Sequence, residues 1–345
     1  MANSVLVVDD SALMRRAIKG ILAETGEFEV HTARNGVDAL DQLGRVHADV
    51  ITLDVNMPEM DGLSCLAQIM EQHPTPVVMV SSLTERNALV TLEALELGAV
   101  DFVPKPGGTV SLNIDEVAGE LITKVRAACS ARLGRRAVRR TPEAPPPIHD
   151  TVPSGAVDLL LIGSSTGGPQ LLADLLPQLP AGLGAPVVVA QHIPASFTAP
   201  LARRLDGLCS LRVHEVDRIE TVQRGNIYLG RGGADVVVAR RTDSLIVKSV
   251  PSSAAYRWHP SVDRLVATAR RHCEPARLVC VLLTGMGDDG AAEIAEVHAA
   301  GGRTIAEAEE TAVVWGMPGE LARRGGASAV LPSYAIADRL ADWVR

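Results

Sequence analysis

The sequence is poor in aromatic residues, in cysteines and in long hydrophobic runs. Aromatic residues make up 3% of its 345 residues, which argues against the stacking platforms that bind single-stranded nucleic acid. The five cysteines include no C-x-x-C pair, so we expect reduced thiols in the cytoplasm rather than a disulfide framework or a zinc site. The longest hydrophobic runs, such as residues 278–283, have the length of a strand, and no membrane insertion is expected.

Basic residues are fewer than acidic ones, 33 against 41. The formal net charge is −8, which argues against a general binder of nucleic acids or of anionic membranes. The first ten residues, MANSVLVVDD, contain no basic segment, and we therefore expect no secretory signal. The length and a hydrophobic content of 47% predict two globular domains.

In the first part of the chain, short apolar runs alternate with helical patterns. We expect strands at residues 4–10, 28–33, 49–55, 76–82 and 99–105, and a last helix at about 113–133. Because parallel strands need a crossover connection, this alternation predicts a parallel sheet covered by helices. The domain is expected to span residues 1–132.

Residues 133–155 differ in composition from their surroundings. They are rich in arginine and proline and have almost no apolar periodicity. Consecutive prolines favour an extended backbone, so this segment is expected to link two domains.

The strand and helix alternation resumes over residues 156–345. Strands are expected at 157–163, 186–191, 211–216, 227–230, 235–240, 244–249, 278–285 and 303–308. Most of these runs are apolar throughout, as in a doubly wound and mostly parallel α/β sheet with helices on both faces. The three runs between 227 and 249 lack intervening helices and predict a small antiparallel meander or hairpin.

Charged and hydroxyl side chains stand at the ends of the expected strands in the first domain. Asp9 and Asp10 end the first strand, Asp54 the third, Ser81 the fourth and Lys105 the fifth. The carboxyl ends of parallel strands share one crevice, and neighbouring carboxylates there suit Mg²⁺. Each acid taken alone is more readily explained as a cap or a strand end, but the set as a whole indicates a phosphorylation site.

Four segments indicate the type of this domain: VLVVDDSALMRR, ITLDVNMPEMDG, PVVMVSS and DFVPKP. In order and spacing they resemble the receiver domains of bacterial response regulators, over about residues 1–130. The resemblance implies a flavodoxin-like fold and Asp54 as the phospho-acceptor. It further implies Mg²⁺ ligands at Asp9, Asp10, Asp54 and the carbonyl of Asn56, and a phosphate-sensing set at Lys105, Ser81 and the aromatic Phe102.

The first strand of the second domain leads into a glycine-rich turn. The sequence GSSTGG (163–168) contains a G-x-S-x-G pattern centred on Ser165, which is typical of a strand-to-helix turn that exposes a nucleophilic serine. A loop of this kind could equally bind a pyrophosphate. It lacks the lysine of a P-loop and the G-x-G-x-x-G pattern.

A histidine and an acid elsewhere in this domain favour the interpretation of Ser165 as a nucleophile. His192 follows the second strand of this domain, and Asp288 and Asp289 follow the strand at 278–285. Serine, histidine and aspartate can therefore meet at the carboxyl edge of the sheet, where a histidine base activates a serine and an acid orients the histidine. The chain order Ser–His–Asp differs from that of the α/β-hydrolases.

Five segments, IGSSTGGP, QHIPASFT, YRWHPSVDRL, LTGMGDDGA and TAVVWGMP, resemble the catalytic domain of chemotaxis protein-glutamate methylesterases. The resemblance implies Ser165 as nucleophile, His192 as base and Asp289 as its orienting acid. It also implies backbone N–H donors for an oxyanion at Thr166 and Met286. Ser164 departs from the alanine usual in that family and adds a second hydroxyl beside the nucleophile.

The resemblance implies hydrolysis of glutamate methyl esters on the cytoplasmic helical region of methyl-accepting chemoreceptors, releasing methanol, and deamidation of receptor glutamines. No cofactor is expected for the esterase reaction. A chemotaxis histidine kinase is the implied phosphodonor, and phosphorylation of Asp54 would relieve blocking by the receiver. The alternative is a non-catalytic output module that binds a nucleotide or a protein partner at the glycine-rich loop.

Overall fold

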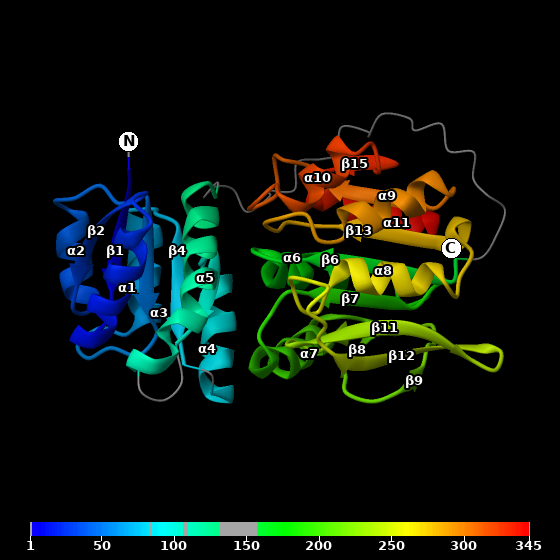
Figure 1. The fold of residues 1–345 in the computed structure, drawn as a ribbon, viewed down its shortest axis with the longest axis horizontal. Coiled ribbons are helices and arrows are strands. Elements are labelled where there is room, and N and C mark those ends of the chain that lie inside the picture. Colours follow the sequence, from blue (N-terminus) through cyan, green and yellow to red (C-terminus); the bar gives the residue numbers. More distant parts are fainter. Residues whose placement is uncertain (1, 83, 106–109, 132–156, 345) are drawn as a thin grey trace. The chain divides into compact units, whose positions relative to one another are not determined.

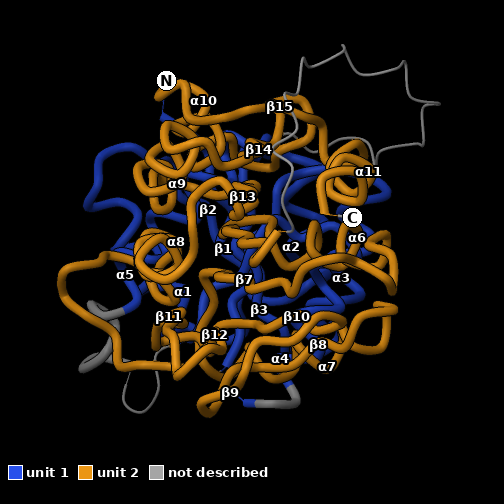
Figure 2. Tube along the Cα trace, turned by 90° about the vertical axis from the view of Figure 1, so that its right-hand side faces the viewer, with its two compact units in different colours: residues 1–134 blue, residues 135–345 orange. Residues whose placement is uncertain are grey.

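The computed structural model describes residues 2–82, 84–105, 110–131 and 157–344, and the chain forms two compact units, residues 1–134 and 135–345 (Figures 1 and 2). The expected linker at 133–155 lies outside the described residues. Among the helices of the described ranges, none combines the length and the apolar character that crossing a membrane requires.

The first unit contains the predicted five-stranded parallel sheet, and its strand order is β2-β1-β3-β4-β5. Its strands are β1 (Asn3–Val8), β2 (Phe28–Ala33), β3 (Val50–Asp54), β4 (Val77–Ser81) and β5 (Asp101–Pro104). The helices are α1 (Ala12–Glu24), α2 (Gly36–Leu43), α3 (Gly62–Gln72), α4 (Glu85–Glu96) and α5 (Val110–Cys129).

Local capping starts several of these helices at the edge of the sheet that carries the acids. Ser11, Asn35 and Asp61 each accept a hydrogen bond from the third backbone N–H of the helix that follows, which satisfies a donor that would otherwise lack a partner. β3 and β4 are buried along their whole length, because helices cover both faces of the sheet.

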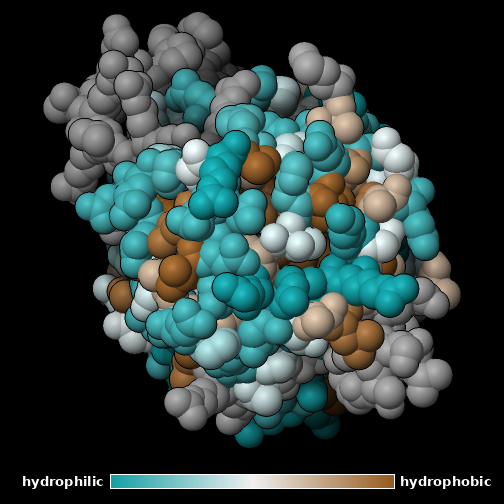
Figure 3. All heavy atoms as spheres, turned by 90° about the vertical axis from the view of Figure 1, so that its left-hand side faces the viewer, coloured by the Kyte–Doolittle hydropathy of each residue, from teal (hydrophilic) through white to brown (hydrophobic). Residues whose placement is uncertain are grey.

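Figure 3 shows the side of this unit that lies at the left in Figure 1. Hydrophilic residues predominate there, and hydrophobic residues form small separate groups. Among the described residues of the unit, the exposed large hydrophobic side chains are those of Leu13, Val37, Leu89 and Leu97.

The second unit contains a seven-stranded parallel sheet with the order β15-β14-β13-β6-β7-β10-β8 and a three-stranded antiparallel sheet with the order β11-β12-β9. The strands of the large sheet are β6 (Leu159–Ser164), β7 (Val187–Gln191), β8 (Arg212–Val216), β10 (Asn226–Gly230), β13 (Leu278–Leu282), β14 (Arg303–Glu307) and β15 (Ala329–Leu331). Those of the small sheet are β9 (Glu220–Thr221), β11 (Ala234–Arg241) and β12 (Ser244–Pro251).

Helices cover both faces of the large sheet. They are α6 (Gly168–Leu175), α7 (Ala195–Leu208), α8 (Val262–Arg270), α9 (Ala291–Ala299), α10 (Met317–Arg323) and α11 (Ser333–Trp343), with short 3₁₀ turns at Leu176–Gln178 and Pro275–Arg277. Side chains of α8, α9 and α10 form one buried core with the sheet and with β11 and β12. On the remaining face, α6 contacts both α7 and α11.

The expected meander over residues 227–249 is only partly correct. β11 and β12 form the predicted antiparallel hairpin, but β10 pairs in parallel with β7 and β8 in the large sheet. The short strand β9 takes the third place in the small sheet. Spacing along the chain could not predict this, because a short apolar run fits a parallel strand as well as a strand of a meander, and β10 lies between β7 and β8 in the large sheet.

The chain order of the strands reverses beside β6. From β6 the chain proceeds to β7 on one side, and later to β13 on the other. In open α/β sheets a crevice forms at the carboxyl ends of the strands where the order reverses. Ser165, His192 and Asp289 follow β6, β7 and β13 and therefore lie at this edge.

Candidate active site

The three acids predicted in the first unit lie together. Asp9, Asp10 and Asp54 each offer a carboxylate oxygen, and these oxygens lie within 4.8 Å of one another. Lys105 Nζ lies 2.6 Å from Asp54 Oδ2 and 2.8 Å from Asp9 Oδ2. Carboxylate oxygens in this arrangement match the ligand preference of Mg²⁺, and the cluster is typical of the Mg²⁺-binding phosphorylation site of receivers.

Asp54 is 2% exposed. Burial raises the pKa of its carboxyl, and the neighbouring Lys105 opposes this shift. Burial also acts to lower the pKa of Lys105, but Asp54 and Asp9 outweigh it and the net shift is upward. A partly exposed cation next to the acceptor carboxylate is suited to neutralise a phosphoryl oxygen.

Two of the predicted phosphate-sensing residues, Ser81 and Phe102, are buried. Ser81 is fully buried at the end of β4, and its Oγ accepts a hydrogen bond from Thr91 Oγ1 of α4 at 2.9 Å. Phe102 is 1% exposed, with Lys124 Nζ 4.9 Å from the centre of its ring. The N–H of Asn56 donates to Asp54 Oδ1 at 3.4 Å.

In the second unit, Ser165 stands at a sharp turn between β6 and α6. Gly167 has φ 77°, in the left-handed region that favours glycine. A Cβ on Gly168 would lie 2.0 Å from Gln191 Oε1, so a larger residue there would displace the side chain of Gln191. The N–H of Ser165 donates to the carbonyl of Thr284 at 2.9 Å. This hydrogen bond attaches the turn to the segment that follows β13.

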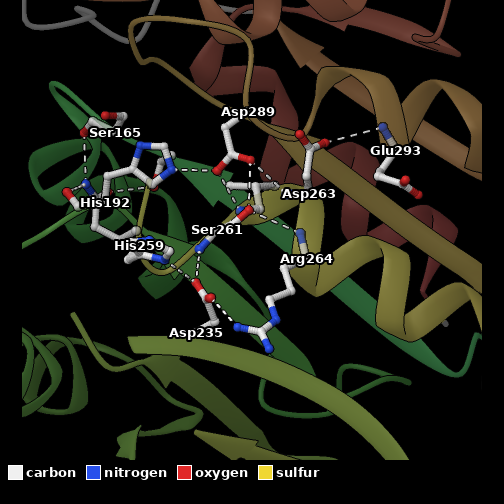
Figure 4. Close-up of polar contacts among 12 residues, drawn as sticks. Ser165, His192, Asp235, His259, Ser261, Asp263, Arg264, Asp289 and Glu293 are labelled. Carbon is white, nitrogen blue, oxygen red and sulfur yellow. Dashed lines mark hydrogen bonds and ion pairs between the residues drawn. The ribbon is translucent and has the colours of Figure 1, made fainter. Parts of the chain in front are cut away.

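The imidazole of His192 lies between Ser165 and Asp289 (Figure 4). His192 Nε2 is 2.8 Å from Asp289 Oδ2. His192 Nδ1 is buried and has no hydrogen-bond partner among the described residues, so it remains available for the hydroxyl of Ser165. Asp288 is exposed, and Asp289 is the acid that the sheet brings to the histidine.

The carboxylate of Asp289 receives hydrogen bonds from the start of α8. Oδ2 accepts from Val262 N at 2.7 Å, and Oδ1 accepts from Ser261 Oγ and Asp263 N at 3.0 Å each. Burial acts to raise the pKa of Asp289, but the hydrogen bonds from His192 and these amides lower it overall. Burial and the nearby Asp289 raise the pKa of Asp263 to about 7. Asp289 is thereby kept ionised and oriented.

Two backbone N–H groups beside Ser165 are free to stabilise an oxyanion. The N–H groups of Thr166 and Met286 donate to no acceptor within the described part of the chain. Gln191 Nε2 donates to the carbonyl of Ser165 at 2.9 Å, which fixes the orientation of the peptide that carries the N–H of Thr166. Preoriented donors of this kind stabilise developing negative charge.

The second hydroxyl, Ser164, is engaged elsewhere. Its Oγ is fully buried and donates to Gln191 Oε1 at 2.6 Å. Gln191 Nε2 donates in turn to the carbonyls of Ser165 and His192, at 2.9 Å each. Ser164 is therefore bound into a bridge between the two turns and does not compete with Ser165.

Sequence reasoning assigned no role to two further residues of the site. The indole of Trp258 stacks on the imidazole of His192, with ring centres 5.6 Å apart and planes at 17°. Glu307 at the end of β14 is fully buried and accepts from Thr284 N at 2.7 Å. Trp258 falls in a segment that carried the family resemblance, but stacking and burial across distant strands leave no local signal in a sequence.

Fold and site together define a receiver coupled to an α/β unit that gathers a serine, a histidine and an aspartate. A family profile described as response regulator receiver domain matches residues 5–113, and one described as CheB methylesterase matches residues 160–340. The chain is 52% identical over 99% of its length to protein-glutamate methylesterase/protein-glutamine glutaminase 3 of Rhodospirillum rubrum, covering 96% of that protein. It is 48% identical over 99% to methylesterase/glutaminase 2 of Carboxydothermus hydrogenoformans, covering 99%.

The solved structure of the Thermotoga maritima CheB methylesterase catalytic domain is also similar. The identity is 36% and the TM-score 0.53, over 55% of this chain and all of that one. The chain belongs to the CheB family of protein-glutamate methylesterases with an N-terminal receiver domain.

Proposed function

We propose that the protein hydrolyses the γ-methyl esters of glutamate side chains in chemoreceptors and deamidates receptor glutamines, with Ser165, His192 and Asp289 as its catalytic residues. Family membership supports the reaction class. The observation that carries the residue assignment is the contact of His192 with Asp289, which leaves the second ring nitrogen unpartnered among the described residues. A module that only binds a ligand at the glycine-rich loop has no need of this arrangement.

In the first half of the reaction, Ser165 Oγ attacks the ester carbonyl while His192 Nδ1 takes its proton. Asp289 stabilises the imidazolium through the hydrogen on Nε2. The N–H groups of Thr166 and Met286 bind the oxyanion of the tetrahedral intermediate. The C–O bond to the methoxy group then breaks, and the leaving oxygen takes the proton from His192, so that methanol departs and a glutamyl ester of Ser165 remains.

In the second half, a water molecule attacks the glutamyl ester and gives its proton to His192. The proton returns to Ser165 Oγ as the glutamic acid side chain is released, and that carboxylic acid then gives its own proton to water. A receptor glutamine follows the same course with ammonia as the leaving group. No cofactor is part of the proposed esterase mechanism, and every proton moves between the substrate, water and these side chains.

The receiver regulates this activity through Asp54, which we propose accepts a phosphoryl group from a chemotaxis histidine kinase. Asp9, Asp10, Asp54 and the carbonyl of Asn56 would hold Mg²⁺, and the cation would neutralise charge during phosphoryl transfer. Lys105 would pair with the phosphoryl oxygens, and Ser81 and Phe102 would respond to them. The domain limits 1–132 and 156–345, the cytoplasmic location and the helical receptor segment as substrate belong to the same proposal.

The test separates the two adjacent serines in the full-length protein. We expect Ser165→Ala to abolish methanol release from a methylated receptor, because it removes the attacking oxygen. Ser164→Ala removes a neighbouring buried hydroxyl and should keep most of the activity. Retained activity in Ser165→Ala together with its loss in Ser164→Ala would refute the assignment of the nucleophile.

A further inference from the structure

A further buried carboxylate of the second unit belongs to Asp235, near the start of β11. Its side chain is fully buried. Asp235 Oδ1 accepts hydrogen bonds from His259 Nδ1 at 2.9 Å and from Ser261 N at 2.8 Å, and Asp235 Oδ2 lies 2.6 Å from Arg264 Nη1 (Figure 4). Burying a charge is costly unless it is paired and hydrogen-bonded, and this one receives three donors from a single segment.

All three donors lie at the start of α8 or directly before it. Ser261 is the N-cap of α8, and Arg264 lies in its first turn. Arg264 Nη1 also donates to the carbonyl of Pro251 at the end of β12, 2.9 Å away. The carboxylate therefore fastens the N-terminus of α8 to the small antiparallel sheet.

The same N-terminus holds the catalytic acid. Ser261 donates its backbone N–H to Asp235 and its hydroxyl to Asp289. Val262 and Asp263 complete the contacts to Asp289. One residue, Ser261, thus joins the buried carboxylate of the small sheet to the acid that orients His192.

The segment fastened by Asp235 also carries the ring that packs on the catalytic base. Trp258 directly precedes His259, and its indole stacks on His192. The imidazole is therefore held on one edge by Asp289 and across its plane by Trp258. Both contacts depend on where residues 258–263 lie.

We propose that Asp235 is a positioning residue of the hydrolytic site, which acts through Ser261 and the segment 258–263 to fix Asp289 and the ring of His192. This inference rests on the proposed function of those two residues. Asp235 itself touches neither the nucleophile nor the base. Its effect on the reaction is geometric, because a small displacement of a catalytic group lowers the rate far more than it lowers substrate binding.

The substitution Asp235→Asn tests this with little change in volume. The amide oxygen can still accept from Ser261 N, but the amide nitrogen would face Arg264, which then has lost its carboxylate partner. We expect kcat for methanol release from a glutamyl methyl ester peptide to fall by about tenfold to a hundredfold, while KM stays nearly unchanged. All measurements use the full-length protein.

Asp158→Asn is the matched control. Asp158 Oδ1 lies 2.6 Å from Arg277 Nη2, so that this pair is as short as the one at Asp235. It precedes β6 and therefore lies at the opposite end of the strand from Ser165. This variant should keep the kcat of the unmodified protein.

A proton NMR measurement reads the geometry without turnover. The hydrogen between His192 Nε2 and Asp289 should resonate far downfield in the unmodified protein and in Asp158→Asn. We expect it to move upfield or broaden in Asp235→Asn. If Asp235→Asn does not fold, His259→Ala removes one donor, leaves the ion pair with Arg264, and should change kcat and the resonance in the same direction but less.

A variant with lowered stability but unchanged kcat and resonance would make Asp235 a purely structural residue and overturn the proposal. A fall in kcat with a displaced resonance supports it. If the unmodified protein released no methanol, the proposed function would fail, and the resonance of Asp235→Asn would still decide whether Asp235 positions the pair.

Discussion

At the scale of the residue, the catalytic proposal depends on which ring nitrogen of His192 faces which partner. Nε2 contacts Asp289, so the neutral ring carries its hydrogen there and presents the lone pair of Nδ1 to Ser165. In chymotrypsin-like triads the two nitrogens have the opposite roles. In both arrangements the ring nitrogen that faces the serine takes the proton, and the acid accepts a hydrogen bond from the N–H of the other ring nitrogen.

Substitution of the two partners of Ser165 should have unequal effects. His192→Gln removes the base and should lower kcat to the level of Ser165→Ala. Asp289→Asn keeps the shape but loses the charge and the preferred tautomer, and should lower kcat by about 10⁴-fold. The rate of methanol release at saturating substrate gives kcat for both variants. Near-normal turnover by His192→Gln would remove the base from the mechanism.

The sequence predicted that Ser165, His192 and Asp289 would lie close together, because each follows a strand at the same edge of one sheet. Their supporting residues, Asp235, Gln191 and Trp258, were not predicted. Each acts through a partner that is distant in the chain or through a stacked ring, and the residue types involved are common in ordinary buried positions. Only the packed structure shows that Gln191 engages the hydroxyl of Ser164.

At the scale of the element, the strand-to-helix turns form the site and the strand β14 supports them. The order of βα units was predictable because runs that are apolar throughout are typical of buried parallel strands. The place of β10 was not, since a short apolar run fits a hairpin as well as a parallel sheet. The short strands β9 and β15 have too few residues to show a period.

Glu307 at the end of β14 gives this support a pH dependence. Burial raises the pKa of its carboxyl to about 7, above its usual value near 4.5, so the folded state favours the protonated form. The contribution of protonated Glu307 to the free energy of unfolding is fully present below about pH 4.5. It is lost as the pH rises through about 7, because the unfolded state then gains more from ionisation than the folded state does. Glu307→Gln never ionises and should be more stable than the unmodified protein at pH 8, by about 3 kcal/mol.

Urea unfolding followed by tryptophan fluorescence measures this difference. Trp258, Trp315 and Trp343 are the only tryptophans of the chain, and all belong to the second unit. The gain in unfolding free energy should shrink toward zero as the pH is lowered to 4.5. A difference that stays constant between pH 5 and pH 8 would show that Glu307 does not titrate in this range.

At the scale of the whole molecule, the receiver and the hydrolytic unit carry separate chemistry within one chain. The acidic cluster at Asp54 and the site at Ser165 belong to different compact units, and each has its own charged groups. We therefore expect removal of divalent metal to affect phosphorylation and to leave basal ester hydrolysis unchanged. Asp54→Asn should hydrolyse at the basal rate and lack any response to a phosphodonor.

Methanol release from a methylated chemoreceptor, followed with the full-length protein and with Asp54→Asn, tests this most directly. The assay is run with Mg²⁺ and a small phosphodonor, without the phosphodonor, and with both plus a chelator. The phosphodonor should raise the rate of methanol release by the unmodified protein by about fivefold or more. Chelation should return this rate to the basal value without abolishing hydrolysis. Equal stimulation of Asp54→Asn, or loss of the basal rate on chelation, would contradict a receiver-regulated serine hydrolase.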